Sequence, residues 1–254
     1  MLIIMNEKEW VEDVMRQRYL GNKRNDTLKR VARYMYHVDG FRGRELRNRL
    51  ERFLLRCNSD ARMSYWDDRL DKIAKGAGKY KLISVDEVCV TEAELETIRA
   101  LDNRQPKRLA FTLLCLAKYW NAVNPNNNNW VTTPSKEIMK MANINTSEHR
   151  QDIMLFKMKE IGLFSFPAKL DSENIRVLFL QDDSPVALRV EDFRNLGNQY
   201  HMYCGERFIS CACCGLVVGK KNNSQKYCAG CASEIYVKKN ANYAGVSGIM
   251  GVRA

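Results

Sequence analysis

The order of apolar and polar residues predicts a helical domain over residues 1–78. Apolar residues recur three and four positions apart without a proline, and turn-forming pairs such as Gly21-Asn22 and Asp39-Gly40 interrupt them. This pattern is typical of amphipathic helices that pack one face against a shared core. The expected helices are Glu7 to Leu20, Asp26 to Val38, Arg42 to Arg56 and Asp60 to Lys75.

A glycine-containing junction, Lys75 to Lys79, separates this domain from a connector over residues 79–104. Tyr80 to Val85 alternates apolar and polar residues and predicts a strand. Thr91 to Glu94 has the pattern of a capping box and predicts a helix that continues through Leu101. We therefore place the first domain boundary at the glycine junction.

The segment 105–181 switches repeatedly between helical and strand-like patterns, with a polar asparagine loop over residues 124–129. The order is helix, short strand, helix, tight turn, helix and hairpin. The expected helices are Pro106 to Val123, Ser135 to Ala142 and Thr146 to Ile161, the last with a capping box from Asn145 or Thr146 to Glu148, and the expected strands are Trp130 to Thr133, Leu163 to Phe166 and Ile175 to Leu180.

This order of elements, with Gly162-Leu163-Phe164 before an apolar hairpin, resembles the winged helix-turn-helix of bacterial and phage regulators and replication proteins. The resemblance implies that the helix beginning at Thr146 enters the major groove with its first residues, while the wing contacts the backbone or minor groove. The polar residues expected at the DNA are Ser147, His149, Arg150, Gln151 and Lys157, and those expected in the core are Ile153, Phe156, Met158 and Ile161.

Two of these side chains match the hydrogen-bonding edges of bases. Arg150 can donate two bonds to guanine, and Gln151 can pair with adenine. Ser147 and Lys157 suit phosphate oxygens. The alternative is that these residues face solvent in a fold that serves protein contacts.

Two CxxC pairs, Cys211 with Cys214 and Cys228 with Cys231, predict a metal site near the C-terminus. Two thiolates three positions apart in a tight turn can reach the same tetrahedral ion, and two such pairs complete its four ligands. A shell closed by four cysteines is structural, since a catalytic zinc keeps an open position. We expect one structural Zn²⁺, which supplies folding free energy to a segment too short for its own core.

The pattern of this segment is a first CxxCG, a basic polar loop and a second KYCxxCA. It resembles the C-terminal zinc ribbons of uncharacterised phage and prophage proteins, which implies an origin in a mobile element. The zinc ribbon is expected over residues 206–240. A linker with a short helix precedes it over residues 182–205, and a flexible tail follows over residues 241–254.

Charge favours a polyanionic partner, because Lys and Arg number 41 against 30 Asp and Glu, a formal net charge of +11. This balance excludes an acidic mimic of DNA. The basic residues are densest in the helical domain, where the alternative is a set of solvated helix faces paired with acids. The expected phosphate contacts are Arg42, Arg44 and Arg47 in that domain and Lys220, Lys221 and Lys226 in the zinc ribbon.

Neither a membrane segment nor a known catalytic motif is expected. The apolar start, Met1 to Met5, lacks the basic residues and long apolar run of a signal peptide. Cys57, Cys89 and Cys115 stand singly, as is typical of a reducing compartment, so we expect a cytoplasmic location in a bacterial host cell. GxGxxG, GxSxG, HExxH and Walker-type loops do not occur, so an enzyme is the least supported class.

The leading hypothesis is a mainly α (α+β), non-enzymatic protein of phage type that binds double-stranded DNA as a regulator of transcription or replication. The alternative is a protein-interaction factor, such as a phage inhibitor of a host nucleic-acid enzyme or an anti-CRISPR-like protein, with a host protein or ribonucleoprotein as partner. A third possibility is the binding of RNA or single strands, with bases stacked on Tyr34, Tyr36, Tyr65 or Trp66.

Overall fold

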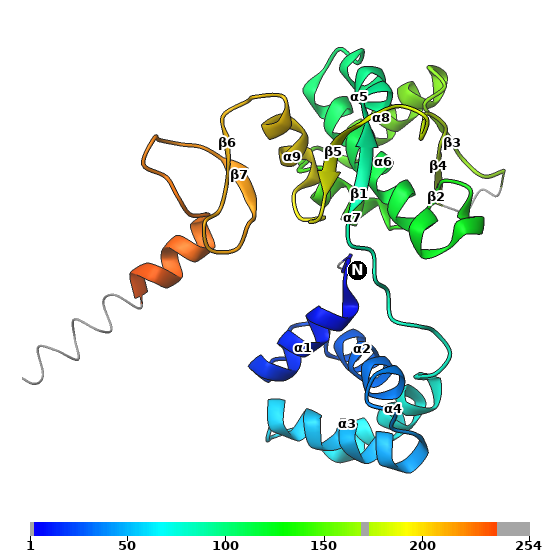
Figure 1. Ribbon diagram of the computed structural model, residues 1–254, viewed down its shortest axis with the longest axis vertical. Coiled ribbons are helices and arrows are strands. Elements are labelled where there is room, and N and C mark those ends of the chain that lie inside the picture. Colours follow the sequence, from blue (N-terminus) through cyan, green and yellow to red (C-terminus); the bar gives the residue numbers. More distant parts are fainter. Residues whose placement is uncertain (1–2, 169–172, 238–254) are drawn as a thin grey trace, which may run out of the picture. The chain divides into compact units, whose positions relative to one another are not determined.

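The computed structural model describes residues 3–168 and 173–237, and it is mainly helical with a few small antiparallel sheets (Figure 1), as the sequence predicts. The chain divides into two compact units that separate between Glu87 and Val88. Among the described residues, no helix is both long enough and apolar enough to cross a membrane. The predicted tail over 241–254 lies outside the described residues.

Four helices form the first unit, each within a few residues of its predicted bounds (Figure 1). Asn6 caps the first of them, because its Oδ1 accepts from the backbone amides of Lys8 and Glu9. Every helix contributes apolar side chains at helical spacing to one core, including Val11, Val31, Leu50 and Leu70. The helices are α1 (Glu7–Gln17), α2 (Arg24–His37), α3 (Gly43–Cys57) and α4 (Met63–Gly76).

A buried carboxylate joins three parts of this unit. The Glu7 side chain is 1% exposed and accepts from Arg30 Nε at 3.0 Å, from Arg33 Nη2 at 2.6 Å and from the backbone amide of Ile83 at 3.0 Å. The backbone of Glu7 also donates to the carbonyl of Ile83. The segment after the glycine junction is thus fastened to α1 and α2, so the unit continues to Glu87 and not to the predicted boundary at residue 78.

The strand predicted over Tyr80 to Val85 is wrong. Ser84 forms only an isolated antiparallel bridge with Asn6, and within the part of the chain that the structure describes the segment has no partner strand. The first strand is instead β1 (Val88–Thr91), which pairs with β5 (Val186–Val190). The alternation of apolar and polar residues is the same in an extended segment held by isolated contacts and in a strand that is hydrogen-bonded to a partner strand. It therefore did not distinguish the two.

The second unit is built around α6 (Arg104–Val123), whose apolar residues are almost all buried. The predicted capping box is confirmed at the start of α5 (Glu92–Arg99), where Thr91 N donates to Glu94 Oε2 at 2.8 Å. α9 (Leu196–Tyr203) lies in the segment predicted as a linker and packs on α6, with the rings of Phe111 and Tyr200 5.4 Å apart. The linker is therefore part of the core.

The elements after α6 follow the predicted order. The sheet order is β2-β4-β3, so the last strand lies between the other two, with Val131 opposite Ile175 and Phe164 opposite Val177. The asparagine loop is ordered by bonds such as Asn121 Nδ2 to Asn129 Oδ1 at 2.6 Å. The elements are η1 (Pro125–Asn127), β2 (Trp130–Val131), α7 (Ser135–Met141), α8 (Glu148–Glu160), β3 (Phe164–Ser165) and β4 (Ile175–Val177).

The inward face of α8 differs from the prediction. Met154, Leu155 and Met158 are buried, so only Met158 was predicted correctly. Ile153, Phe156 and Ile161 are exposed by 42%, 55% and 61%. Apolar residues occupy two faces of this helix, so spacing alone does not select the face that packs on its neighbours.

The start of α8 also differs from the prediction. Its N-cap is Ser147, which makes no side-chain cap bond, so the capping box expected from Asn145 or Thr146 to Glu148 is wrong.

A small C-terminal module follows α9. β6 (Phe208–Ser210) and β7 (Val217–Gly219) form an antiparallel pair, and a helix covers residues 229–237. The buried amide of Asn198 on α9 donates to Val217 O at 3.1 Å and holds β7 against α9.

Candidate metal centre

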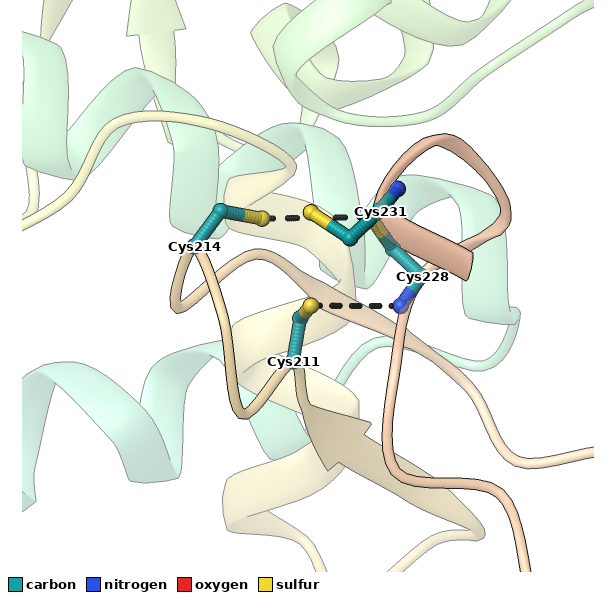
Figure 2. A group of neighbouring side chains, drawn as sticks. All are labelled: Cys211, Cys214, Cys228 and Cys231. Atoms are coloured by element: carbon teal, nitrogen blue, oxygen red, sulfur yellow. Dashed lines mark hydrogen bonds between the residues drawn. The ribbon is translucent and has the colours of Figure 1, made fainter. Parts of the chain in front are cut away.

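Four cysteine side chains of the C-terminal module point toward one another (Figure 2). The Sγ atoms of Cys211, Cys214, Cys228 and Cys231 all lie within 4.8 Å of one another. The Cys214 and Cys228 sulfurs are 3.8 Å apart, and a tetrahedral site with metal–sulfur bonds of about 2.3 Å separates its sulfurs by about 3.8 Å. The predicted four-cysteine set is confirmed as a cluster that can hold one metal ion, and its chemistry is consistent with zinc.

A tight turn after β6 presents the first pair. Gly215 has φ +73°, a conformation that favours glycine, and its amide donates to Cys211 O at 2.8 Å. The amide of Cys211 donates to Leu216 O at 3.0 Å, which closes the turn where β7 begins. Cys211 and Cys214 are thereby held on the same side of the turn (Figure 2).

The start of the last helix presents the second pair. Cys228 immediately precedes the helix over residues 229–237, and Cys231 lies in its first turn. The Cys228 amide donates to Cys211 Sγ at 3.2 Å, and the Cys231 amide donates to Cys228 Sγ at 3.5 Å (Figure 2). Amide donors and the positive end of a helix favour the thiolate form of a cysteine.

Hydrogen bonds within the cluster shift the pKa values of two of its thiols in opposite directions. The hydrogen bond from the backbone amide of Cys228 lowers the pKa of the Cys211 thiol to about 6. Hydrogen bonds to the Cys214 and Cys228 sulfurs raise the pKa of Cys231, because a further thiolate among sulfurs is unfavourable. A divalent ion that displaces the shared protons relieves this conflict and binds all four sulfurs.

The remaining cysteines near the module do not join the cluster. Cys204 and Cys213 are both exposed, and among the described residues neither belongs to the group of four sulfurs. Arg194 fastens the module from outside, since its Nη2 donates to Cys214 O at 2.6 Å while it pairs with Asp192 at 2.7 Å. Arg194 thus ties the Cys214 backbone to the segment that precedes α9.

The residues predicted for the groove are partly assembled on α8. Ser147, His149 and Arg150 are exposed in the first turn, and Lys157 is exposed two turns later on the same side as Arg150. Gln151 is half-buried and donates to Thr146 O at 2.7 Å, so it is tied to its own turn and is a poor reader of adenine.

Two of the three predicted arginines of the first unit are engaged within the fold. Arg42 lies over the ring of Tyr36, 3.5 Å from its centroid, and donates to Phe41 O at 2.8 Å. Arg47 pairs with three carboxylates, those of Glu51, Asp67 and Asp71. Arg47 is thus neutralised by acids from α3 and α4, which corrects its assignment as a phosphate contact.

An exposed basic stripe lies on the outer face of α3. Arg52 and Arg56 lie about one turn apart and Arg44 about two turns before Arg52, so the three lie within an arc of about 120° of the helix surface, and all three are exposed. Within the described ranges they form no ion pair. The spacing of these arginines can be read from the sequence. The sequence does not show that Arg47, and not Arg44, pairs with the acids of α4.

The three predicted lysines of the metal module lie between the two cysteine pairs in the sequence. Lys221 and Lys226 are exposed and Lys220 is half-buried, in the loop that joins β7 to the second cysteine pair.

Comparisons of this chain with protein-family models, curated protein sequences and solved structures found no match. The function is therefore inferred from the residues of the chain itself.

Proposed function

We propose that this chain is a non-enzymatic protein that binds double-stranded DNA, with a winged helix-turn-helix over residues 105–181. The observation that carries the proposal is the sheet order β2-β4-β3, with α7 and α8 between β2 and β3. A strand, two helices joined by a tight turn and a returning hairpin are the parts of such a domain. In this arrangement the second helix of the pair, α8, is the one that enters a groove.

The first turn of α8 has the chemistry for this contact. Its N-cap, Ser147, makes no side-chain cap bond, so its first amides and the positive end of the helix are available to a phosphate. Arg150 lies next to this end and can donate two bonds to a guanine. Lys157, two turns further along, suits a phosphate of the same groove.

The basic stripe supplies a second, sequence-independent contact. Arg44, Arg52 and Arg56 extend over three turns of α3 and are exposed, so each can contact a backbone phosphate. Each phosphate that an arginine neutralises releases counterions, so binding through the stripe weakens steeply with salt.

We propose that the four cysteines bind one Zn²⁺ and that the module is a zinc ribbon. Four thiolates leave no open position for a substrate, so the ion is structural. Lys220, Lys221 and Lys226 then form a positive edge of this module that can meet phosphate. The resemblance of the CxxCG and KYCxxCA patterns to phage proteins extends the proposal to a chain of phage or prophage origin.

Binding of a labelled duplex by the full-length protein, followed by fluorescence anisotropy, tests this proposal. The double charge reversal R150E/K157E should weaken binding at least about tenfold, since a lost base or phosphate contact costs about 1–3 kcal/mol. The matched control K8E/K29E reverses two exposed lysines of the first unit and should change affinity far less. If R150E/K157E and the unchanged protein bound the duplex with equal affinity, α8 would not be part of the DNA interface.

A second candidate function is supported by the exposed apolar residues of α8. Ile153 and Phe156 lie one turn apart and Ile161 follows the last turn, and such contiguous exposure is frequent at protein interfaces. The partner in this case is a host protein. A pull-down from bacterial lysate with nuclease treatment distinguishes the two functions. If the second function holds, a protein partner stays bound in stoichiometric amounts after nuclease treatment. The same partner should no longer bind the variant I153S/F156S.

A further inference from the structure

A cavity of about 630 Å³ lies at the start of α6, apart from both the cysteine cluster and α8. Its walls come from the end of α5, the first turn of α6, α9 and the residues that follow α9. The charged and ionisable side chains that line it include Arg99, Asp102, Arg104, Lys107, His201 and Glu206. This volume is in the usual range of small-molecule sites.

The first turn of α6 lines this cavity with positive charge alone. α6 has 20 residues, yet its N-cap Asn103 makes no side-chain cap bond and its first turn contains no acid. The amides of Arg104 and Gln105 therefore have no intrahelical acceptor, and the positive end of the helix dipole coincides with the Arg104 and Lys107 side chains. Like charges at this end are unfavourable unless an anion joins them.

An unsatisfied histidine lines the same cavity. His201 is 2% exposed, and within the described residues its Nε2 has no hydrogen-bond partner. Its Nδ1 lies 2.5 Å from Glu206 Oε1, and its ring stacks on Phe208. Buried polar groups are nearly always satisfied, so a buried ring nitrogen without a partner beside a cavity indicates a missing bound group.

The electrostatics agree with an anion. Burial lowers the pKa of Arg108, which follows Lys107 in α6, and the neighbouring charge of Arg104 lowers it further while Glu206 opposes the shift. Burial likewise lowers the pKa of His201, with Glu206 opposing the shift and Arg104 and Arg108 adding to it. Glu206 is shared between Arg104 and His201, which leaves Lys107 without an ion-pair partner among the described residues. Along the cavity wall, the cations Arg99, Arg104 and Lys107 thus face two carboxylates, those of Asp102 and Glu206.

We propose that this cavity binds a phosphate monoester or free phosphate, held by the first amides of α6, by Arg104 and Lys107, and by His201. A tetrahedral dianion accepts from backbone amides, a guanidinium fork and an ammonium at once. The same group can come from inorganic phosphate in solution or from the terminal phosphate of a nucleic-acid strand. The second source rests on the proposed function, whereas the first does not.

Calorimetric titration of the full-length protein with inorganic phosphate, against sodium chloride of equal ionic strength, tests the site. We expect saturable binding of one phosphate and a change in the His201 imidazole signals by NMR. R104Q/K107Q should lower the affinity at least about tenfold, whereas K136Q/K140Q, which removes two exposed lysines of α7, should not. Because Arg104 also pairs with Glu206, K107Q alone serves as a second variant that leaves this ion pair intact.

Absence of saturable binding at millimolar phosphate, or unchanged affinity in K107Q, would overturn the site. Competition then identifies the source. If the ligand is a strand terminus, a 5′-phosphorylated strand should bind more tightly than its 5′-hydroxyl counterpart, and K107Q should abolish this difference. If the ligand is free phosphate, the two strands should bind equally while the protein still binds phosphate. R150E/K157E should retain phosphate binding, so failure of the DNA interface and failure of this site are separable.

Discussion

The side-chain amide of Asn143 donates a 2.9 Å hydrogen bond to Oδ1 of Asn198, across 55 positions of the sequence. Asn143 lies in the turn between α7 and α8, with φ +53°, and Asn198 lies on α9. The amide of Asn198 in turn donates to Val217 O of β7 at 3.1 Å. One buried side chain therefore connects the turn before α8 to the module that carries the cysteines.

Substitution N198A should destabilise the second unit by about 1–3 kcal/mol, because Val217 O and the Asn143 amide lose a buried partner. Urea denaturation followed by circular dichroism measures this difference. Asn223 is exposed in the loop of the metal module, and N223A should leave the free energy of unfolding within about 0.5 kcal/mol. Similar values for the two variants would show that the Asn198 bonds contribute nothing to stability.

Cys228 supplies one of the four sulfurs of the proposed zinc site. The purified protein should contain one equivalent of zinc by elemental analysis, and C228S should lose it, because three sulfurs cannot close the shell. C213S, which changes an exposed cysteine of the same module, should retain it. Full retention of metal in C228S, or a module that stays folded after chelation, is incompatible with the proposed zinc ribbon.

Much of this architecture was predictable from the sequence because it is local. The four helices of the first unit follow apolar spacing, the capping box needs only Thr91 and Glu94, and each CxxC pair is contained in one turn. The pairing of β1 with β5 was missed because the two short strands stand almost 100 positions apart. The cavity at α6 was missed for the same reason, since His201 and Arg104 come from distant segments.

A pH prediction follows from Lys118, which bonds to buried Glu94 at 2.9 Å and to exposed Asp182 at 2.7 Å. Burial opposes its charge, but the bonds to Asp182 and Glu94 outweigh burial and raise its pKa. A raised pKa in the folded state stabilises the fold below the ordinary lysine value of about 10.4, and this contribution is lost as pH rises through the folded value.

D182N should lower the pKa of Lys118 and move alkaline unfolding of the second unit to lower pH. D183N, which changes the adjacent exposed acid, is the control and should not. Unfolding curves between about pH 9 and pH 12 measure the shift. Coincident curves for the two variants would show that Asp182 does not support the charge on Lys118.

Removal of the buried charge of Glu7 should destabilise the first unit. E7Q leaves Arg30 and Arg33 without their shared carboxylate, a loss of about 3–5 kcal/mol for a broken buried ion pair. E9Q, at an exposed position of the same helix, should have an effect below about 0.5 kcal/mol. Thermal denaturation provides the comparison, and equal midpoints would assign Glu7 no role in fastening residues 80–85.

The most direct test of DNA binding is the salt dependence of duplex affinity, measured by anisotropy on the full-length protein and on R44Q/R52Q/R56Q. We predict a steep decline of affinity with salt in the unchanged protein, and a slope of log K against log salt that is shallower by about 2.7 in the variant, at about 0.9 per phosphate contact. The charge-matched control K8Q/R16Q/K29Q should keep a steeper slope. No duplex binding at low salt, or identical slopes for the stripe variant and the unchanged protein, would contradict the proposal.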